Sequence, residues 1–258
     1  MLCVSNLGYC THGAAILHGI SLEIHPQELV VVIGKNGSGK SSLLRCLSGW
    51  NREHTGSVLL QNKALGKFSA KERAGLISLL PQHPRLTESI PVLDVITTAR
   101  YRFTESHATS RTIATGILER NGLSHFQHRD WNTLSGGEAQ QIALVCLEAQ
   151  NAQIWLLDEP ANHLDPAVQI QIYNRIIQEW QQGRTIILVT HNINLVLQTV
   201  PQEKHSIVRV VGIDRGTISF DSTLHSSDCT EKIGKLYGLA VDTVSAFGAT
   251  QLVFGSKP

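Results

Sequence analysis

The stretch Gly34-Lys35-Asn36-Gly37-Ser38-Gly39-Lys40-Ser41 decides the fold of this chain, because it fits the phosphate-binding pattern G-x-x-x-x-G-K-[ST] at every fixed position. It follows the apolar run Leu29 to Ile33, which predicts a buried strand, and opens a helix expected from Lys40 to about Leu47. Its glycines let the backbone turn N–H groups inward around a phosphate, and the helix directs its positive end at the same anion. The pattern therefore predicts a nucleoside triphosphate site.

A second motif, Ile154-Trp155-Leu156-Leu157-Asp158-Glu159-Pro160, is an apolar strand that stops at two carboxylates. Lys40 would reach the β- and γ-phosphates, and the Ser41 hydroxyl would bind Mg²⁺. Asp158 would bind the same Mg²⁺, directly or through water, and Glu159 would polarise a water that attacks the γ-phosphate. Alone, two carboxylates after a strand would indicate a solvated turn. Together with the phosphate loop they indicate a metal and hydrolysis site.

A third motif, Leu134-Ser135-Gly136-Gly137-Glu138, precedes a helix predicted to run through Leu147. Ser135 as cap and Glu138 three residues later fit a capping box. The glycines at the helix start also make a second N-terminus able to bind an anion. The phosphate loop already supplies an anion-binding helix N-terminus for a nucleotide bound to its own chain. We therefore expect the second helix N-terminus to bind a nucleotide held by another subunit.

Length and composition are those of an ordinary globular protein. The chain has 258 residues, 42% of them hydrophobic and 17% charged, enough for one compact unit. A net charge of only +1 predicts no nucleic-acid partner. The five cysteines lack C-x-x-C pairs, which predicts reduced cysteines in a cytosolic protein. The twelve histidines lack the spacing of metal ligands. No apolar run approaches the roughly 20 residues that span a bilayer, and no signal-like N-terminus is present, so we expect neither a membrane span nor export.

The apolar pattern divides the chain into strands and helices. Strands are predicted at Ser21–Ile24, Leu29–Ile33, Ser57–Leu60, Ile154–Leu157 and Thr185–Val189. Helical spacing fills the middle of the chain from about Pro84 to Gln150. A further helix begins with Asp165 as N-cap and Pro166 at its first position, and ends near Gly183. Strand, helix and strand in this order predict a parallel sheet with right-handed crossovers.

The middle of the chain opens with more apolar residues than one narrow core-facing stripe of a helix needs. They are Val92, Leu93, Val95 and Ile96. We therefore expect some of them, with Leu93 as the candidate, to face a groove in which a partner docks. The alternative is that Leu93 only packs the helical lobe.

Six motifs follow one another in order along the chain: G-x-N-G-S-G-K-S, Pro81-Gln82, L-S-G-G-E, L-L-D-E-P, Asn162-His163-Leu164-Asp165 and Thr190-His191. Together they resemble the ATP-binding subunits of ABC transporters over nearly the whole chain. The resemblance implies an α/β fold: a P-loop NTPase core with a mainly parallel sheet, an N-terminal antiparallel β subdomain and an inserted α-helical subdomain. It implies a single domain over residues 1–258, with the nucleotide-binding core at about 1–83 and 151–258 and the helical signature subdomain at about 84–150.

The resemblance also implies roles for single residues. Tyr9 would stack on adenine. Gln82 would touch Mg²⁺ and water and link the core to the helical subdomain. Residues 135–137 would clamp the γ-phosphate held by the opposite subunit of a head-to-tail dimer. Asp165 would belong to a loop that crosses between the two sites, and His191 would contact the γ-phosphate as a sensor.

The implied cofactors are ATP and Mg²⁺. The residues expected at the nucleotide are Tyr9, Gly34, Lys35, Asn36, Gly37, Ser38, Gly39, Lys40, Ser41, Ser42, Gln82, Ser135, Gly136, Gly137 and Asp165. The residues expected to act in hydrolysis are Glu159, His191 and Lys40. The residues expected at Mg²⁺ are Ser41, Gln82 and Asp158.

Within the family, the chain is most similar to ATPases of importers for iron-siderophore complexes, haem and vitamin B12. The residues that carry this similarity are Leu80-Pro81-Gln82-His83, Val92-Leu93-Asp94-Val95, Ala99-Arg100-Tyr101, Asn162-His163-Leu164-Asp165 and Leu236-Tyr237-Gly238. The similarity implies a peripheral protein on the cytoplasmic face of the cell membrane. Its partners would be a second copy or a paired ABC subunit, a membrane-spanning permease and, indirectly, a substrate-binding protein.

Several positions depart from the family pattern. Gln141 replaces a usual arginine after the signature, so the helix loses a cation that normally helps to organise its lobe. Other departures are Gln27, Ser42, Ala99 and the stretch Leu144-Val145-Cys146-Leu147. None removes a group required for Mg²⁺ binding or water activation, so hydrolysis is expected.

Two other functions are compatible with the nucleotide motifs. A non-transport ABC ATPase acting on DNA or ribosomes would need long coiled coils, paired cysteines or a second ATPase unit, and the chain has none of these sequence features. A degenerate regulatory nucleotide binder would lack groups that are intact here, namely Lys40, Asp158, Glu159 and His191. Both alternatives are therefore less favoured than transport.

Overall fold

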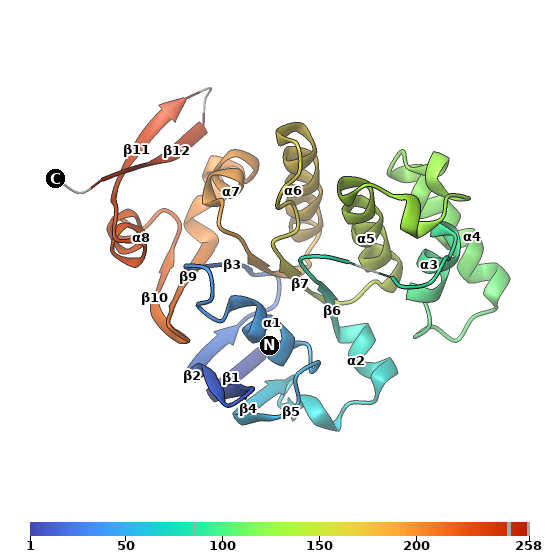
Figure 1. Cartoon of the computed structure of the whole chain (residues 1–258), viewed down its shortest axis with the longest axis horizontal. Helices are drawn as coiled ribbons and strands as arrows, with labels where there is room; N and C mark the ends of the chain where they lie inside the picture. The colour runs from blue at the N-terminus through green and yellow to red at the C-terminus, as the bar shows by residue number, and fades with distance from the viewer. Residues whose placement is uncertain (85, 247–248, 257–258) are drawn as a thin grey trace.

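The computed structural model describes residues 1–84, 86–246 and 249–256, which form three sheets and the helices around them (Figure 1). The largest sheet has the strand order β10-β9-β3-β8-β7-β6. Its strands are β3 (Leu29–Ile33), β6 (Ile77–Leu80), β7 (Ile154–Asp158), β8 (Thr185–Val189), β9 (Val208–Asp214) and β10 (Thr217–Thr223). Neighbouring strands are parallel except for β9 and β10. The strands β3, β7 and β8 are buried throughout, as expected for parallel strands covered on both faces.

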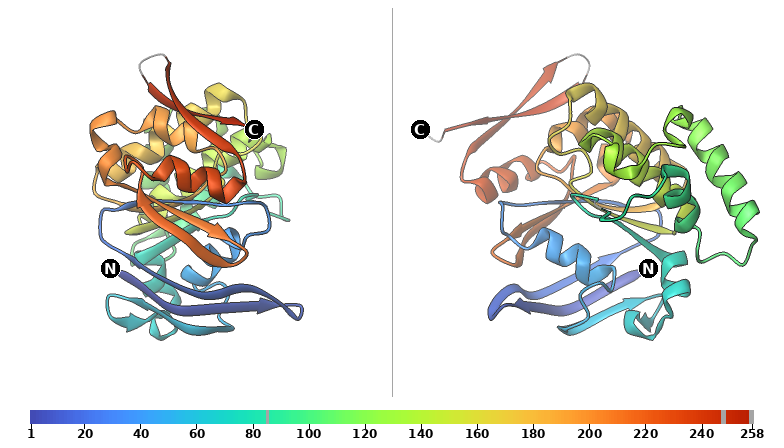
Figure 2. Two further views of the ribbon diagram at one scale, coloured as in Figure 1. Left: turned by 90° about the vertical axis from the view of Figure 1, so that its left-hand side faces the viewer. Right: turned by 45° about the vertical axis from the view of Figure 1, so that its right-hand side comes forward.

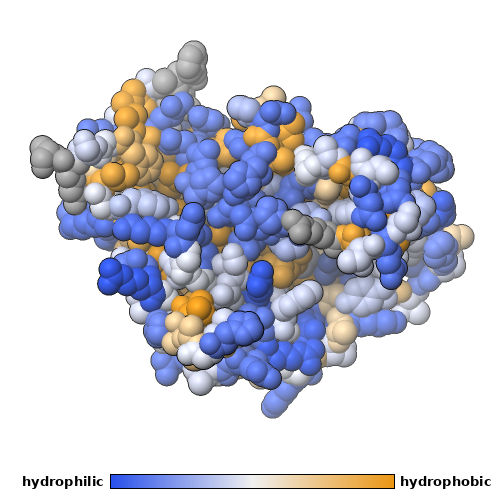
Figure 3. All heavy atoms as spheres, viewed as in Figure 1, coloured by the Kyte–Doolittle hydropathy of each residue, from blue (hydrophilic) through white to orange (hydrophobic). Residues whose placement is uncertain are grey.

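One face of this sheet is covered by α1 (Lys40–Leu47) and, beyond it, by an antiparallel sheet (Figures 1 and 2). The antiparallel sheet has the order β2-β1-β4-β5 and consists of β1 (Leu2–Thr11), β2 (Ala14–Ile24), β4 (His54–Leu60) and β5 (Lys63–Ala64). A separate C-terminal hairpin is formed by β11 (Ala240–Ala246) and β12 (Ala249–Gly255). Apolar side chains gather on the surface over this hairpin (Figure 3), where Val244, Val253 and Phe254 are exposed.

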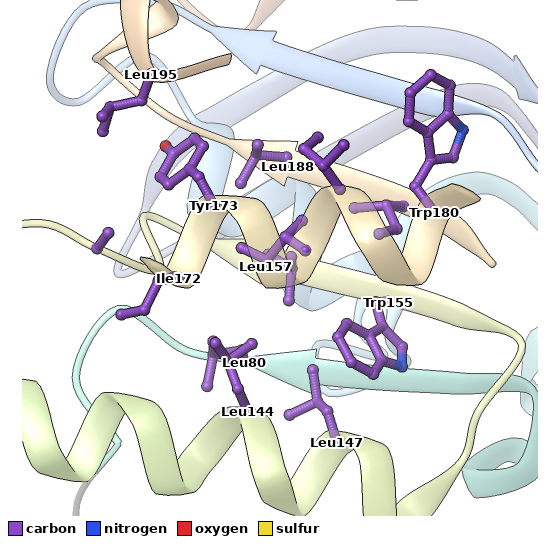
Figure 4. Packing of buried hydrophobic residues seen from close by; sticks show 14 of the residues in the cluster. Leu80, Leu144, Leu147, Trp155, Leu157, Ile172, Tyr173, Trp180, Leu188 and Leu195 are labelled. Atoms are coloured by element: carbon purple, nitrogen blue, oxygen red, sulfur yellow. The ribbon is translucent and has the colours of Figure 1, made fainter. Parts of the chain in front are cut away.

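Helices cover the opposite face. They are α3 (Val92–Ala99), α4 (His107–Arg120), α5 (Gly136–Gln150), α6 (Pro166–Gln181), α7 (Ile193–Thr199) and α8 (Cys229–Tyr237). Figure 4 shows Leu144 of α5 and Tyr173 of α6 turned toward Leu157 and Leu188 of the strands. The remaining helical elements are α2 (Ala70–Leu76) and 3-10 turns at Leu65–Lys67, Ser124–Phe126, Trp131–Thr133 and Gln202–Ile207.

The expected fold class is confirmed, and β3, β8 and α1 have the predicted bounds. The limits of the helical subdomain at about 84 and 150 remain a prediction. The strand β1 was not predicted, and β2 begins seven residues before the predicted Ser21, at Ala14. The reason lies in β1 itself, which contains Asn6 with φ 49° and shifts its register against both neighbours. An Asn-Leu-Gly sequence that resembles a turn is accommodated there as a β-bulge.

The expectation that Leu93 faces a partner groove was wrong. The side chain of Leu93 is 4% exposed, and Val92 and Ile96 beside it are fully buried. The helix α3 packs against both α4 and α5, so its apolar residues fill two contacts rather than one. A helix with helical neighbours on two sides needs a wider apolar face, which the single-stripe argument did not allow for.

Leu93→Glu should therefore lower the free energy of unfolding by about 2–4 kcal/mol, because a carboxylate without a partner would enter an apolar interior. Urea denaturation followed by circular dichroism measures this change. Ile170→Glu, at a helix position that is 41% exposed, is the matched control and should stay within about 0.5 kcal/mol of the parent. Equal stability of the two variants would contradict the burial of Leu93.

Candidate functional site

The carboxyl ends of four neighbouring parallel strands, β3, β8, β7 and β6, meet at one edge of the main sheet. The segments that follow these strands line one cavity of about 880 Å³. Residues 34–42 follow β3, His191 follows β8, Glu159 follows β7 and Gln82 follows β6. The structure thus brings the phosphate loop together with the polar residues expected to act on its ligand.

The loop after β3 passes so close to its neighbours that glycine is required. A Cβ atom on Gly34 would lie 2.2 Å from the carbonyl oxygen of Ile213. Gly39, at φ 103°, would place its Cβ 2.8 Å from a methyl carbon of Leu17 and is the residue from which α1 begins. The hydroxyl of Ser38 is buried and has no hydrogen-bond partner among the described residues. The loop therefore presents a backbone cradle to the cavity, with the buried Ser38 hydroxyl unpaired within the loop.

Lys40 is the buried cation of this cavity. Its ammonium group donates hydrogen bonds to the carbonyl oxygens of Gly34, at 2.8 Å, and Lys35, at 3.1 Å. Burial lowers the pKa of Lys40, and the charges of Glu159 and Asp158 act against that shift. A bound phosphate would add negative charge beside the ammonium and favour its charged form further.

Ser41 lines the cavity and is paired with the buried Asp158 behind it. The Ser41 hydroxyl donates to Oδ1 of Asp158 at 3.1 Å. Burial raises the pKa of Asp158, while the hydrogen bond from Ser41 opposes the rise. One hydroxyl and one carboxylate fit Mg²⁺, which proteins commonly hold through one or two carboxylates together with substrate phosphates. The described residues contain no group of three or more His, Cys, Asp or Glu side chains able to hold a metal alone.

Glu159 is held in place from three directions. Its Oε2 accepts hydrogen bonds from Nε2 of Gln82, at 3.0 Å, and from Nδ2 of Asn162, at 2.7 Å, and Nδ1 of His191 lies 3.5 Å away. Its backbone has φ 48°, a conformation that costs energy for a residue with a side chain and that clusters at functional sites. The sequence motif included Asn162 but gave no reason to place its amide on Glu159.

The position of His191 depends on the residues before and after it. The buried Thr190 hydroxyl accepts a hydrogen bond from the Tyr173 hydroxyl at 2.7 Å and another from the backbone N–H of Asn192 at 3.0 Å. The His191 side chain itself is 51% exposed and lines the cavity. A fixed backbone with a half-exposed imidazole suits contact with a ligand that enters from solvent.

The signature motif lies outside the phosphate cavity. Ser135 caps α5 through the backbone N–H of Glu138, and Oε2 of Glu138 accepts from the Ser135 backbone at 2.6 Å, so the predicted capping box is confirmed. Gly136 lines a neighbouring cavity of about 470 Å³ together with Gln82 and Asn162. Asp165 occupies the N-cap position of α6 as predicted, but its side chain makes no capping hydrogen bond. The roles proposed for residues 135–137 and Asp165 remain predictions.

Tyr9 is half-buried in β1 and packs against the apolar cluster beneath the main sheet. Its cross-strand partner is Leu17. The neighbouring Ile16 lines the phosphate cavity, whereas Tyr9 does not. Its stacking on adenine stays a prediction.

Gln141, which replaces the usual arginine after the signature, shares a small pocket with Arg175 of α6. The Arg175 guanidinium pairs with Glu148 of α5. A cation from the neighbouring helix thus ties α5 to α6 close to the position where the usual arginine is absent.

Among the described residues, no helix combines the length and apolar character needed to cross a membrane. Residues 17–162 match the family model of the ABC transporter. The petrobactin import ATP-binding protein of Bacillus anthracis is 34% identical over 186 residues, 70% of this chain and 68% of that protein. A hemin import ATP-binding protein of Rhodopseudomonas palustris is 30% identical over 238 residues, 89% of this chain and 87% of that protein.

Solved structures confirm the fold. A nucleotide-free ATP-binding cassette from an ABC transporter matches with a TM-score of 0.74 at 23% identity, over 92% of this chain and 94% of that one. A dimeric ATP-binding cassette in a post-hydrolysis state, bound to ADP and Pi, matches with a TM-score of 0.71 at 24% identity, over 88% of this chain and 100% of that one. With its phosphate loop, paired carboxylates and signature helix in this arrangement, the chain belongs to the ABC transporter family and is one of its ATP-binding subunits, an ATPase.

Proposed function

We propose that this chain hydrolyses ATP to energise import of an iron-siderophore, haem, cobalamin or other metal complex through a separate membrane permease. The observation that carries the ATPase site is the Glu159 carboxylate, fixed by Gln82 and Asn162 over the cavity that the phosphate loop lines. The import direction rests on relatives named as petrobactin, iron(3+)-hydroxamate and hemin import ATP-binding proteins. The subunit would sit peripherally on the cytoplasmic face of the membrane.

The geometry supports a direct role for each group in hydrolysis. Lys40 would exchange the two loop carbonyls that it now contacts for the β- and γ-phosphate oxygens. Mg²⁺, held by Ser41 and Asp158, would supply positive charge that neutralises the phosphates. Because hydrogen bonds from Gln82 and Asn162 hold Oε2 of Glu159, Oε1 remains to take a proton from the attacking water. As the new P–O bond forms, the bond from the γ-phosphorus to ADP breaks and inorganic phosphate results.

A second subunit would complete the site. The N-terminus of α5, which can bind an anion, does not line its own phosphate cavity. In a head-to-tail dimer, residues 135–137 of each copy would contact the γ-phosphate bound by the other. ATP would then favour the closed dimer through contacts that exist only with the triphosphate, and hydrolysis would remove them.

The permease would dock in a groove between the core and the helical subdomain. This groove has a volume of about 550 Å³ and is lined by Trp50, Pro81 and Tyr101, among others. Trp50 is 77% exposed and Tyr101 51% exposed, which makes them candidate aromatic anchors. Pro81 precedes Gln82, whose amide touches Glu159, so the groove is one residue away from the hydrolysis site.

Lys40→Ala should abolish ATP hydrolysis and weaken ATP binding, because the cavity would lose the cation that balances the phosphates. Phosphate release and equilibrium dialysis with labelled ATP measure the two effects. Lys67→Ala, in a surface 3-10 turn, is the control and should match the parent. Near-parent turnover by Lys40→Ala would refute the phosphate-loop assignment.

Glu159→Gln should separate binding from chemistry. The amide keeps the size of the carboxylate but cannot take a proton, so turnover should fall by roughly 10²- to 10⁴-fold while ATP still binds. Size-exclusion chromatography with ATP and Mg²⁺ should then show a trapped dimer. Hydrolysis at the parent rate would move the role of general base to another group.

Trp50→Ala should leave the ATPase rate of the isolated subunit unchanged and weaken co-purification with a co-expressed permease. Truncating an aromatic anchor at an interface commonly costs about 2 kcal/mol or more, roughly a thirtyfold loss of affinity. Ile207→Ala, at a position that is 59% exposed away from the groove, is the matched control. A Trp50→Ala subunit that co-purifies as well as this control would exclude the groove as the docking site.

A further inference from the structure

A residue from the far end of the chain reaches the phosphate cavity. Tyr237, the last residue of α8, lines the cavity together with Gly34, Glu159 and His191. Figure 1 shows α8 beside β9 and β10, next to the strand from which the phosphate loop emerges.

The Tyr237 hydroxyl is buried and contacts the Gly34 backbone, and its own proton has no acceptor among the described residues. Only one other buried side-chain hydroxyl of those residues shares this property, that of Ser38, and it lines the same cavity. Buried polar groups in folded proteins are nearly always paired, so two hydroxyl protons without an acceptor beside one cavity favour a polar ligand there. Both hydroxyls can donate to a phosphate oxygen.

The Tyr237 hydroxyl keeps its proton in this cavity. Burial raises the pKa of Tyr237, a contact with the Gly34 backbone opposes the rise, and the charge of Glu159 adds to it. The hydroxyl therefore remains protonated at neutral pH and can act as a donor. Tyr237 lines the same cavity as the first residue of the phosphate loop, Gly34, and the carboxylate assigned to the attacking water, Glu159.

The C-terminal hairpin fixes Tyr237 in this position. The Tyr237 ring meets the ring of Phe254 edge to face, with centroids 6.1 Å apart. The same hairpin is bound to α7, because the Asn194 amide donates to the Leu252 carbonyl at 3.0 Å and accepts from the Leu252 N–H at 2.8 Å. Since α7 begins just after His191, one hairpin supports both Tyr237 and the segment that carries the histidine.

We propose that the Tyr237 hydroxyl donates a hydrogen bond to the terminal phosphate of bound ATP, so that Tyr237 helps the site to distinguish a nucleoside triphosphate from a diphosphate. This role rests on the proposed nucleotide site and adds to it a contact from the C-terminal segment. Tyr237 shares its wall of the cavity with Glu159 and His191, the residues assigned to the γ-phosphate. ADP, which lacks that phosphate, would leave the hydroxyl proton without an acceptor.

Tyr237→Phe in the full chain tests the proposal, with affinities for the non-hydrolysable analogue AMP-PNP and for ADP measured by calorimetry with Mg²⁺. Loss of a hydrogen bond to a charged group should weaken AMP-PNP binding roughly tenfold. The affinity for ADP should stay within about twofold, and the melting temperature should fall little, because the hydroxyl's only contact within the protein is with the Gly34 backbone. Tyr101→Phe, which removes a hydroxyl bonded to the Ala70 carbonyl outside the cavity, is the matched control.

Two results would overturn the role of Tyr237: unchanged affinity for AMP-PNP, or equal losses for AMP-PNP and ADP. Lys40→Ala, measured in parallel, separates this failure from failure of the nucleotide site. If Lys40→Ala loses binding while Tyr237→Phe matches the parent, only the Tyr237 contact is refuted. If Lys40→Ala binds both nucleotides like the parent, the site itself has been misplaced and the Tyr237 proposal falls with it.

Discussion

The parallel register of β3, β8, β7 and β6 is the constraint on which the site depends. Val189 of β8 pairs with Val32 of β3 on one side and with Asp158 of β7 on the other, and Leu157 of β7 pairs with Leu80 of β6. The strands therefore end level with one another, and the polar residues that follow them lie in the same space. Backbone hydrogen bonds continue the alignment past the strands, from the Glu159 N–H to the Val189 carbonyl and from the Thr190 N–H to the Val32 carbonyl. A slip of one residue would turn Asp158 to the other face of the sheet.

This alignment concentrates opposite charges, the buried Lys40 and Asp158 among them, at one edge of the sheet. Burial disfavours the charged forms of both residues: it lowers the pKa of Lys40 and raises the pKa of Asp158. A magnesium triphosphate bound as proposed would offset both costs, because its negative charge would favour the charged Lys40 ammonium and its metal the charged Asp158 carboxylate. Glu159 is held by its hydrogen bonds from Gln82 and Asn162. The same carboxylate accepts a hydrogen bond from Gln82, which precedes the proposed helical subdomain, so the proposed site would couple nucleotide state to the position of that subdomain.

The sequence predicted the parts of the fold that depend on local patterns. The strand β3 and the helix α1 have the expected bounds because an apolar run and a glycine turn define them on their own. The burial of Leu93 could not be read in this way, since it depends on two helices distant in sequence that pack on α3. The bulged β1 was missed because Asn6 and its neighbours resemble a turn until strands on both sides hold them.

The residues of the site likewise divide into those that local motifs predict and those that depend on distant contacts. Lys40, Ser41, Asp158 and Glu159 were predicted because short motifs carry their chemistry, and the structure gathers them around one cavity, although their roles await measurement. Asn162 and Tyr237 were not assigned to this site. Nothing in their local sequence reports that an amide three residues after Glu159 turns back onto it, or that the end of α8 meets the phosphate loop.

The central claim is that each chain holds half of a hydrolysis site and that a second copy completes it. A mixed dimer of Lys40→Ala and Ser135→Arg chains, isolated with two different affinity tags, tests this most directly. One composite site of that dimer carries both changes and the other carries neither, so activity should return to about half of the parent rate although each variant alone is inactive. A mixed dimer as inactive as its parents, or a Ser135→Arg chain with the parent rate, would contradict the account.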